Sequence, residues 1–355
     1  MNNLKGKLLI TAIGLLFAGG LFFGTNPTGA QTAVKAPPPL ATPTPTVEDD
    51  EIIIDTEVVN VLFTAQDKNR RLLTNLKQGD VKLIENGQQQ EITYFARQVD
   101  LPLSLAILID TSASQERTLP EEKEAAKSFI DSVVRPTKDE VAIVSFTGET
   151  TLEQGMTNNV SRLRRAVDRV QFVPPTGYVG GGILVGGTPP ISGRNQQAQG
   201  STAIWDAIWV TGEEVLGPSP DKTRRAIVLL TDGINTYGLK KLEDAVQSAL
   251  KAEAVIYAIG IGDDYQQGVN EGALRKISEK TGGRAFFPRD ERQLRDAFDQ
   301  IQVEMRSQYL VAYEPTNQTR DGSYRTIDVQ VTNPDLQKEK VKLTHRQGYF
   351  AKTKK

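Results

Sequence analysis

Residues 103–110 read LSLAILID, and TSAS follows directly at residues 111–114. An uninterrupted apolar run of this length is typical of a strand that is buried on both faces of a parallel sheet. Three later runs have the same character: EVAIVSFTG at 140–148, RRAIVLLTDG at 224–233 and AVIYAIGIG at 254–262. Helical patterns separate them. This alternation over roughly 200 residues predicts an α/β fold, a doubly wound Rossmann-like sheet.

The predicted helices carry one apolar face each. In EEKEAAKSFIDSVV (121–134), Ala126, Phe129, Ile130 and Val133 recur at helical spacing. The other predicted helices are SRLRRAVDRV (161–170), TAIWDAIWVTGEEVL (202–216), LEDAVQSALKAE (242–253), EGALRKISEKTG (271–282) and ERQLRDAFDQIQVEM (291–305).

Segments on both sides of this domain have a period of two instead, which is typical of short strands. Before it lie IIIDTEVVNVLFTA, RRLLTNL, VKLIENG and QQQEITYFA; after it lie SQYLVAYEP, RTIDVQVT and EKVKLTHRQGYF. Each set has too few strands for a stable sandwich of its own. We therefore expect residues 51–100 and 307–351 to pair into one Ig-like β-sandwich, with the domain 101–306 inserted between them. The alternative is two independent β-rich flanks packed on the α/β domain.

Residues 1–30 have the pattern of a secretory signal peptide. Lys5 and Lys7 precede an uncharged apolar run, and small residues at Thr28 and Ala30 predict cleavage after Ala30. The alternative is an uncleaved membrane anchor. Residues 31–50 are rich in proline, which predicts an extended linker. The rest of the chain is thus expected to be exported by a bacterial cell, and to be periplasmic, on the cell surface or secreted.

Composition limits the chemistry. The 355 residues include 42 Lys and Arg against 44 Asp and Glu, for a net charge of −2, which disfavours a nucleic-acid partner. There is no cysteine and a single histidine, His345. Disulfides, thiolate metal sites and zinc sites built from several histidines are excluded. A bound metal would therefore have oxygen ligands.

Oxygen-bearing side chains follow the predicted central strands. Asp110, Ser112 and Ser114 alternate after LSLAILID, so all three side chains can point the same way. Asp232 ends another strand, and Thr202 begins a predicted helix. Two carboxylates and three hydroxyls suit Mg²⁺, with Mn²⁺ or Ca²⁺ as alternatives, and leave it able to accept a partner's carboxylate. The plain alternative is that DTSAS only caps the next helix.

These motifs resemble the von Willebrand factor type A (VWFA) domain. DTSAS resembles the D-x-S-x-S motif of its metal-ion-dependent adhesion site (MIDAS), while GSTAIWDAI and LLTDG resemble the segments that supply the remaining ligands. The resemblance implies a metal site formed by Asp110, Ser112, Ser114, Thr202 and Asp232. It covers about residues 103–302.

The whole exported chain also resembles the bacterial secreted VWFA-related proteins, through DKNRRLLTNL, the tail SQYLVAYEPTNQTRDGSYRTIDVQV and QGYFA. The inserted arrangement is similar to that of integrin β chains. However, Arg117 and Thr118 stand where those chains have further acidic ligands, so a second adjacent metal is not expected. The resemblance implies metal-dependent protein binding and no catalysis.

A Gly- and Pro-rich insertion at 172–200 precedes Thr202. Long loops inside compact domains are usually functional or disordered. We expect this loop to contribute partner contacts through Tyr178, Ile183 and Leu184, the alternative being a loop with no role.

The predicted function is an extracytoplasmic adhesion or scaffold module whose Mg²⁺ accepts an Asp or Glu of a protein ligand, with membrane contact only through an uncleaved N-terminal segment. The alternative function is a metal-assisted hydrolase.

Overall fold

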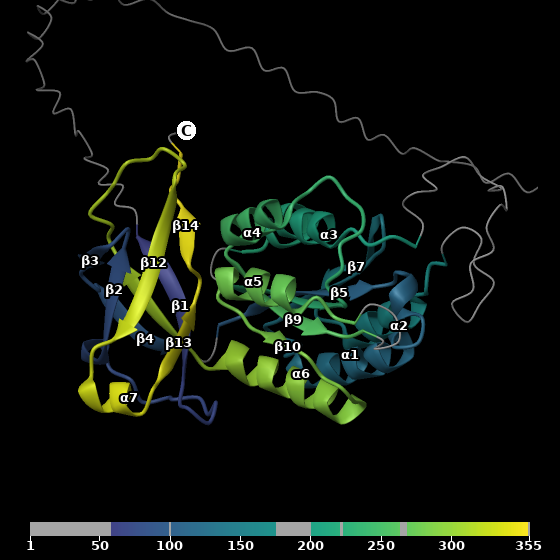
Figure 1. Ribbon diagram of the computed structural model, residues 1–355, viewed down its shortest axis with the longest axis horizontal. Coiled ribbons are helices and arrows are strands. Elements are labelled where there is room, and N and C mark those ends of the chain that lie inside the picture. Colours follow the sequence, from purple (N-terminus) through teal and green to yellow (C-terminus); the bar gives the residue numbers. More distant parts are fainter. Residues whose placement is uncertain (1–57, 99–100, 175–199, 221–222, 263–267, 354–355) are drawn as a thin grey trace, which may run out of the picture. The chain divides into compact units, whose positions relative to one another are not determined.

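The computed structural model describes residues 58–98, 101–174, 200–220, 223–262 and 268–353 (Figure 1). Within these ranges no helix is long and apolar enough to cross a membrane.

The central sheet has six strands in the order β10-β9-β8-β5-β6-β7. Strand β5 (Leu103–Asp110) is buried along its whole length and runs parallel to both of its neighbours, β6 (Glu140–Phe146) and β8 (Arg224–Thr231). Strands β9 (Ala254–Gly260) and β10 (Ala285–Phe286) continue the parallel part. The doubly wound α/β prediction is therefore confirmed, with one antiparallel strand, β7 (Thr150–Thr157), added at an edge.

Three helices cover each face of this sheet. One layer consists of α1 (Leu119–Val133), α2 (Val160–Arg169) and α6 (Glu291–Arg306), and it packs on Leu105 and Ile107 of β5. The other consists of α3 (Ile204–Val210), α4 (Leu242–Lys251) and α5 (Glu271–Thr281), and it packs on Ala106 and Leu108. Figure 1 shows α3 and α4 on one side of the sheet and α1 and α6 on the other. A π-helical turn, Thr211–Leu216, continues α3.

In the described part of the chain, two further sheets of four strands each combine strands from both sides of the α/β domain. Their orders are β13-β1-β11-β4 and β14-β12-β2-β3. The first flank supplies β1 (Val59–Gln66), β2 (Val81–Glu85), β3 (Gln88–Gln90) and β4 (Tyr94–Gln98). The second supplies β11 (Gln308–Tyr313), β12 (Tyr324–Val331), β13 (Lys342–His345) and β14 (Gly348–Phe350). Short helical turns lie at Gln78–Asp80, Ala113–Gln115 and α7 (Pro334–Lys338).

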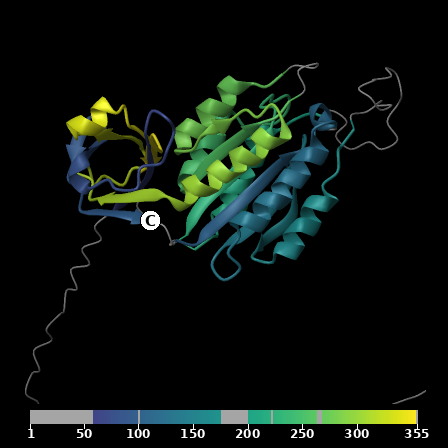
Figure 2. The ribbon, with the colours of Figure 1, turned by 90° about the horizontal axis from the view of Figure 1, so that it is seen from below.

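The pairing makes the two flanks interdependent. β1 lies between β11 and β13, and β12 lies between β2 and β14, all antiparallel. Side chains of both sheets share one core, which includes Phe63, Leu83, Val311 and Val329. Figure 2 shows the strands of these sheets enclosing that interior. Neither flank supplies a complete sheet by itself.

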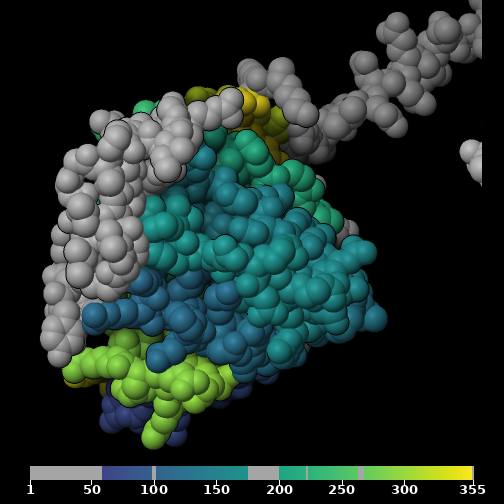
Figure 3. All heavy atoms as spheres, turned by 90° about the vertical axis from the view of Figure 1, so that its right-hand side faces the viewer, coloured from purple at the N-terminus to yellow at the C-terminus, as the bar shows by residue number. Residues whose placement is uncertain are grey.

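The α/β domain enters and leaves on neighbouring strands. Gln98, at the end of β4, pairs with Gln308, at the start of β11, and α6 ends only two residues before Gln308. The first part of this domain, coloured blue and teal, forms most of the described surface on the face seen in Figure 3.

Three strand predictions were wrong in detail, one of which, EKVKLTHRQGYF, divides into β13 and β14 in different sheets. RRLLTNL forms no strand, although Leu72 makes a single bridge to Gln66. In this segment a side chain, and not a neighbouring strand, bonds two backbone groups. The Tyr309 hydroxyl accepts from the Leu76 amide at 3.0 Å and donates to the Leu73 carbonyl at 3.1 Å. QQQEITYFA divides into β3 and β4.

Candidate metal centre

Asp110 lies at the carboxyl end of β5 and is completely buried. Its Oδ1 accepts the Ser112 amide at 2.9 Å, which turns the chain back over the strand end. Its Oδ2 accepts the Thr231 hydroxyl at 2.5 Å, from the end of the neighbouring strand β8. These contacts fix the carboxylate between two adjacent strand ends, the position at which open α/β sheets bind ligands.

The two predicted serines and the second aspartate lie at the same place. The hydroxyl oxygens of Ser112 and Ser114 are 3.2 Å apart. Asp232, immediately after β8, is buried and receives a hydrogen bond from the side chain of Ser114. Four of the five predicted residues are thus linked by direct contacts around one point.

Thr202 belongs to the same edge of the sheet but is held by its backbone. Its carbonyl accepts the amides of Thr236 and Tyr237 at 2.9 and 3.0 Å, from the loop that follows Asp232. The next amide, of Ala203, donates to the Thr147 carbonyl just after β6 at 2.7 Å. Within the described ranges, no hydrogen bond joins the Thr202 hydroxyl to the other four side chains. Thr202 therefore lies between the loops after β6 and β8, which flank the end of β5.

When no cation is bound, the ionised forms of Asp110 and Asp232 are both disfavoured. Burial, and then the nearby charge of Asp232, raise the pKa of Asp110 to about 7. Burial also raises the pKa of Asp232, against the hydrogen bond from Ser114. A divalent cation between them would compensate both charges, because an opposite charge at short range favours the ionised form. The donors are carboxylates and hydroxyls, so the residues present fit a hard ion such as Mg²⁺.

Among the described residues, no group of three or more His, Cys, Asp or Glu could hold a metal. A site that uses two aspartates and several hydroxyls is consistent with that finding, since only two of its ligands are carboxylates.

The sequence interpretation missed Glu122, a fully buried carboxylate on the first turns of α1. In the described part of the chain no well-aligned hydrogen bond reaches its carboxylate oxygens, although the nearby Thr118 hydroxyl favours the ionised form. Burial chiefly raises its pKa to about 8, and the charges of Asp110 and Asp232 add to the effect. A signal was available: Glu122 precedes Ala126 by four residues, which places it on the apolar face of the predicted helix.

The predicted partner-binding residues Tyr178, Ile183 and Leu184 lie outside the described residues.

Comparisons with known proteins identify the family of the α/β domain. Two family models, each described as a von Willebrand factor type A domain, match residues 103–181 and 191–300. Together they span the six-stranded sheet and its helices. The chain is therefore a von Willebrand factor type A domain protein.

Solved structures with a similar fold share little sequence. Proximal thread matrix protein 1 from the mussel byssus is 21% identical with a TM-score of 0.45, over 62% of this chain and 51% of that one. One structure of that protein has a zinc-occupied MIDAS motif. BatB from Bacteroides thetaiotaomicron is 17% identical with a TM-score of 0.41, over 59% of this chain and 100% of that one.

A von Willebrand factor type A protein from Catenulispora acidiphila is 15% identical with a TM-score of 0.45, over 85% of this chain and 75% of that one. The chain spans about half the length of the mussel protein. A search of curated protein sequences gives no significant match.

Proposed function

We propose that this chain is an extracytoplasmic, metal-dependent protein-binding module. Asp110, Ser112, Ser114, Thr202 and Asp232 hold Mg²⁺, or alternatively Mn²⁺ or Ca²⁺. The bound ion is a Lewis acid that accepts one oxygen of an Asp or Glu side chain presented by a protein partner. The signal-like segment 1–30 supports export, and the resemblance to the secreted VWFA-related proteins supports a role as an adhesion or scaffold module.

One observation carries the proposal: two buried aspartates and two serine hydroxyls meet at the carboxyl ends of adjacent parallel strands, and among the described residues no basic side chain is bonded to either carboxylate. Buried charges are normally paired with an opposite charge or bound to a metal. If DTSAS only capped the next helix, there would be no reason for a second carboxylate, from another strand, to lie at the same point. The helix-cap alternative therefore explains less of the geometry.

The chain's own groups prepare the site in separate ways. The Thr231 hydroxyl and the Ser112 amide orient the carboxylate of Asp110. The Ser114 hydroxyl orients Asp232. With only two anionic ligands, the site with a divalent ion bound is close to neutral, so the ion can still accept a third carboxylate without strong charge repulsion.

A binding role is better supported than the hydrolase alternative. General base catalysis requires a group within hydrogen-bond reach of the attacking water and substrate. Outside the proposed ligands, Glu122 is a nearby carboxylate with a raised pKa of about 8, but it has no exposed surface. A substrate at the strand ends would not reach it.

The test is calorimetric titration of Mg²⁺ and Mn²⁺ into the metal-free protein, compared with Asp110→Asn. We expect saturable binding in the wild type and a loss of at least tenfold in affinity in the variant. Asp139→Asn is the matched control, since Asp139 is also a buried aspartate of the α/β domain but lies before β6. Equal affinity in the wild type and Asp110→Asn would overturn the metal site, and turnover of ester or phosphate substrates that Asp110→Asn abolishes would favour the hydrolase.

A further inference from the structure

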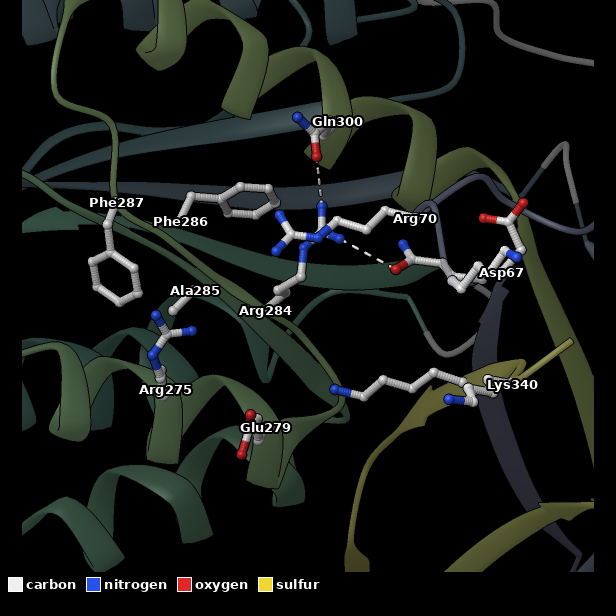
Figure 4. A pocket seen from close by; sticks show the side chains of 13 residues that line it. Asp67, Arg70, Arg275, Glu279, Arg284, Ala285, Phe286, Phe287, Gln300 and Lys340 are labelled. Carbon is white, nitrogen blue, oxygen red and sulfur yellow. Dashed lines mark hydrogen bonds between the residues drawn. The ribbon is translucent and has the colours of Figure 1, made fainter. Parts of the chain in front are cut away.

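A second candidate site is a cavity of about 580 Å³ that contains none of the five proposed metal ligands. Its walls come from the turn after β1, from α5, from β10, from α6 and from the start of β13. Six basic side chains and two acidic ones line it: Lys68, Arg70, Arg275, Arg284, Lys340 and Lys342, with Asp67 and Glu279. Figure 4 shows the charged ends of Arg70, Arg284 and Lys340 directed toward the same space, whereas that of Arg275 lies apart, beside Phe287. The volume is within the range of small-molecule sites.

Part of this charge is already compensated. Arg275 bonds Glu271 at 2.8 Å, and Asp67 bonds Arg71 at 2.8 Å. Arg284 bonds Glu304 at 2.7 Å. In the described part of the chain, Lys68, Arg70, Lys340 and Lys342 form no ion pair, against one unpaired acid, Glu279. The cavity therefore keeps a net positive charge.

Arg284 gives the cavity a rigid floor. Besides Glu304, its guanidinium donates to the side-chain oxygens of Gln300 at 2.9 Å and Gln66 at 3.3 Å. It also lies 4.4 Å from the ring centre of Phe286. A guanidinium has five N–H donors, so donors remain after these contacts. A fixed guanidinium with spare donors is the group that best matches the oxygens of a phosphate.

The backbone is unusual at two of the unpaired cations. Arg70 has φ 64° and Lys340 has φ 54°, and they are two of the four non-glycine residues with positive φ in the described part of the chain. Glycine adopts this conformation without strain, whereas arginine and lysine do not. Two of these four left-handed positions carry a cation, and those two line the same cavity.

We propose that this cavity binds a ligand with more than one phosphate-type anionic group. Its volume exceeds what one oxyanion needs, and its unpaired cations lie on two separate segments, so a multivalent anion can engage both at once. The ligand's source is either a soluble oligophosphate or a phospholipid headgroup. The site is independent of the proposed metal site, and its occupancy does not require a divalent ion.

The test is calorimetric titration of tripolyphosphate into the full chain without added divalent ions, compared with the double variant Arg70→Gly/Lys340→Gly. Because glycine relieves both left-handed positions, the variant should fold at least as well as the wild type, with an equal or higher Tm. We expect saturable binding to the wild type and at least a tenfold higher Kd for the variant. Parallel sedimentation with phosphatidylglycerol vesicles, against phosphatidylcholine vesicles, distinguishes the two sources; loss of either interaction in the variant supports the site.

Two controls match the design. Glu253→Gly relieves another left-handed position, φ 52°, which does not line this cavity. Lys276→Ala removes an exposed lysine of α5 that pairs with Glu243 outside the cavity. Neither should change the Kd for tripolyphosphate. Unchanged binding in the double variant, absence of saturable binding to both probes, or tighter binding of a polyglutamate peptide than of tripolyphosphate would overturn the proposal. The Mg²⁺ titration should be the same in the double variant as in the wild type.

Discussion

Asp110 and Asp139 are both buried in the α/β domain, yet their surroundings move their pKa values in opposite directions. Asp110 has hydroxyl and amide partners and a second carboxylate nearby, and its pKa rises to about 7. Burial also acts to raise the pKa of Asp139, but hydrogen bonds from Arg135 and Arg306 outweigh it and hold the pKa at about 2. Asp139 is thus compensated by arginines of the chain, whereas Asp110 has no cationic partner among the described residues and is the aspartate that we propose binds a metal ion.

The contribution of Asp139 to the free energy of unfolding should therefore decrease at acid pH. Because its pKa is lower in the folded protein than its usual value near 4 in unfolded chains, its contribution is complete above about pH 4. It is lost as the pH falls toward 2. We expect Asp139→Asn to lower the free energy of unfolding by about 2–4 kcal/mol at pH 7. Denaturant unfolding between pH 7 and pH 2 checks this, and a difference that persists unchanged at pH 2 would contradict it.

Glu122 should behave in the opposite sense. Its pKa is about 8 in the folded protein and near 4.3 when unfolded, so ionisation favours the unfolded chain as the pH rises between these values. In metal-free protein, Glu122→Gln should stabilise the fold by on the order of 2 kcal/mol at pH 8, with no gain below about pH 4. Thermal unfolding across this range measures it. Glu121→Gln, at an exposed position on the same turn, is the control for the loss of a side-chain charge.

Among individual residues, the sequence was most informative about the side chains that directly follow a strand. Asp110, Ser112, Ser114 and Asp232 could be predicted because alternate residues at neighbouring strand ends point to one place. The backbone bonds that hold Thr202 depend on a loop far along the chain, and no local pattern encodes them.

Secondary elements were predictable where burial imposes a regular period. β5, β6, β8 and β9 are apolar on both faces because helices cover the sheet on each side. β7 was not predicted, since it pairs on one side only and its sequence TTLEQGMT is largely polar. The segment RRLLTNL alternates like a strand, but the Tyr309 hydroxyl occupies two of its backbone groups.

This arrangement predicts a local effect of Tyr309→Phe. The change keeps the ring that stacks on Phe63 at 5.2 Å but removes the bonds to Leu73 and Leu76. We expect a loss of about 1–3 kcal/mol in the free energy of unfolding, because two backbone groups lose their partner. Amide hydrogen exchange at Leu76 should accelerate. Tyr94→Phe, at an exposed position, is the control, and equal exchange rates in both variants would contradict the assignment.

On the scale of the whole chain, the α/β domain is an insertion between two paired strands. Because Gln98 pairs with Gln308, β4 and β11 would form a simple hairpin if the domain were absent. The pattern of short strands on both flanks predicted that sheets would lie there, but the pairings that join the two flanks are set by contacts between residues more than 200 positions apart. A period of two does not specify a partner.

Replacing residues 99–307 by an Asn-Gly turn should therefore leave a foldable β-sandwich. Asn-Gly favours the two-residue turns that connect antiparallel strands. We expect a cooperative unfolding transition and dispersed amide NMR signals from the shortened protein. The same replacement with Arg325→Leu, which leaves buried Glu85 without the guanidinium 3.5 Å away, is the comparison and should be much less stable. A shortened chain that shows no cooperative transition would mean that the flanks require the inserted domain.

Because β1 pairs with β11 and β13, the ribosome synthesises β1 long before the strands that pair with it. Between the emergence of Gln98 and that of Gln308, 308 − 98 = 210 further residues must be made. At synthesis rates of about 5–20 residues per second this takes roughly 10–40 s. Throughout that interval β1 has no neighbour on either side, and unpaired strand edges invite association with other chains. The first flank therefore stays open to association with its copies until β11 and β13 have been made, so strands synthesised late complete a sheet that begins with a strand synthesised early.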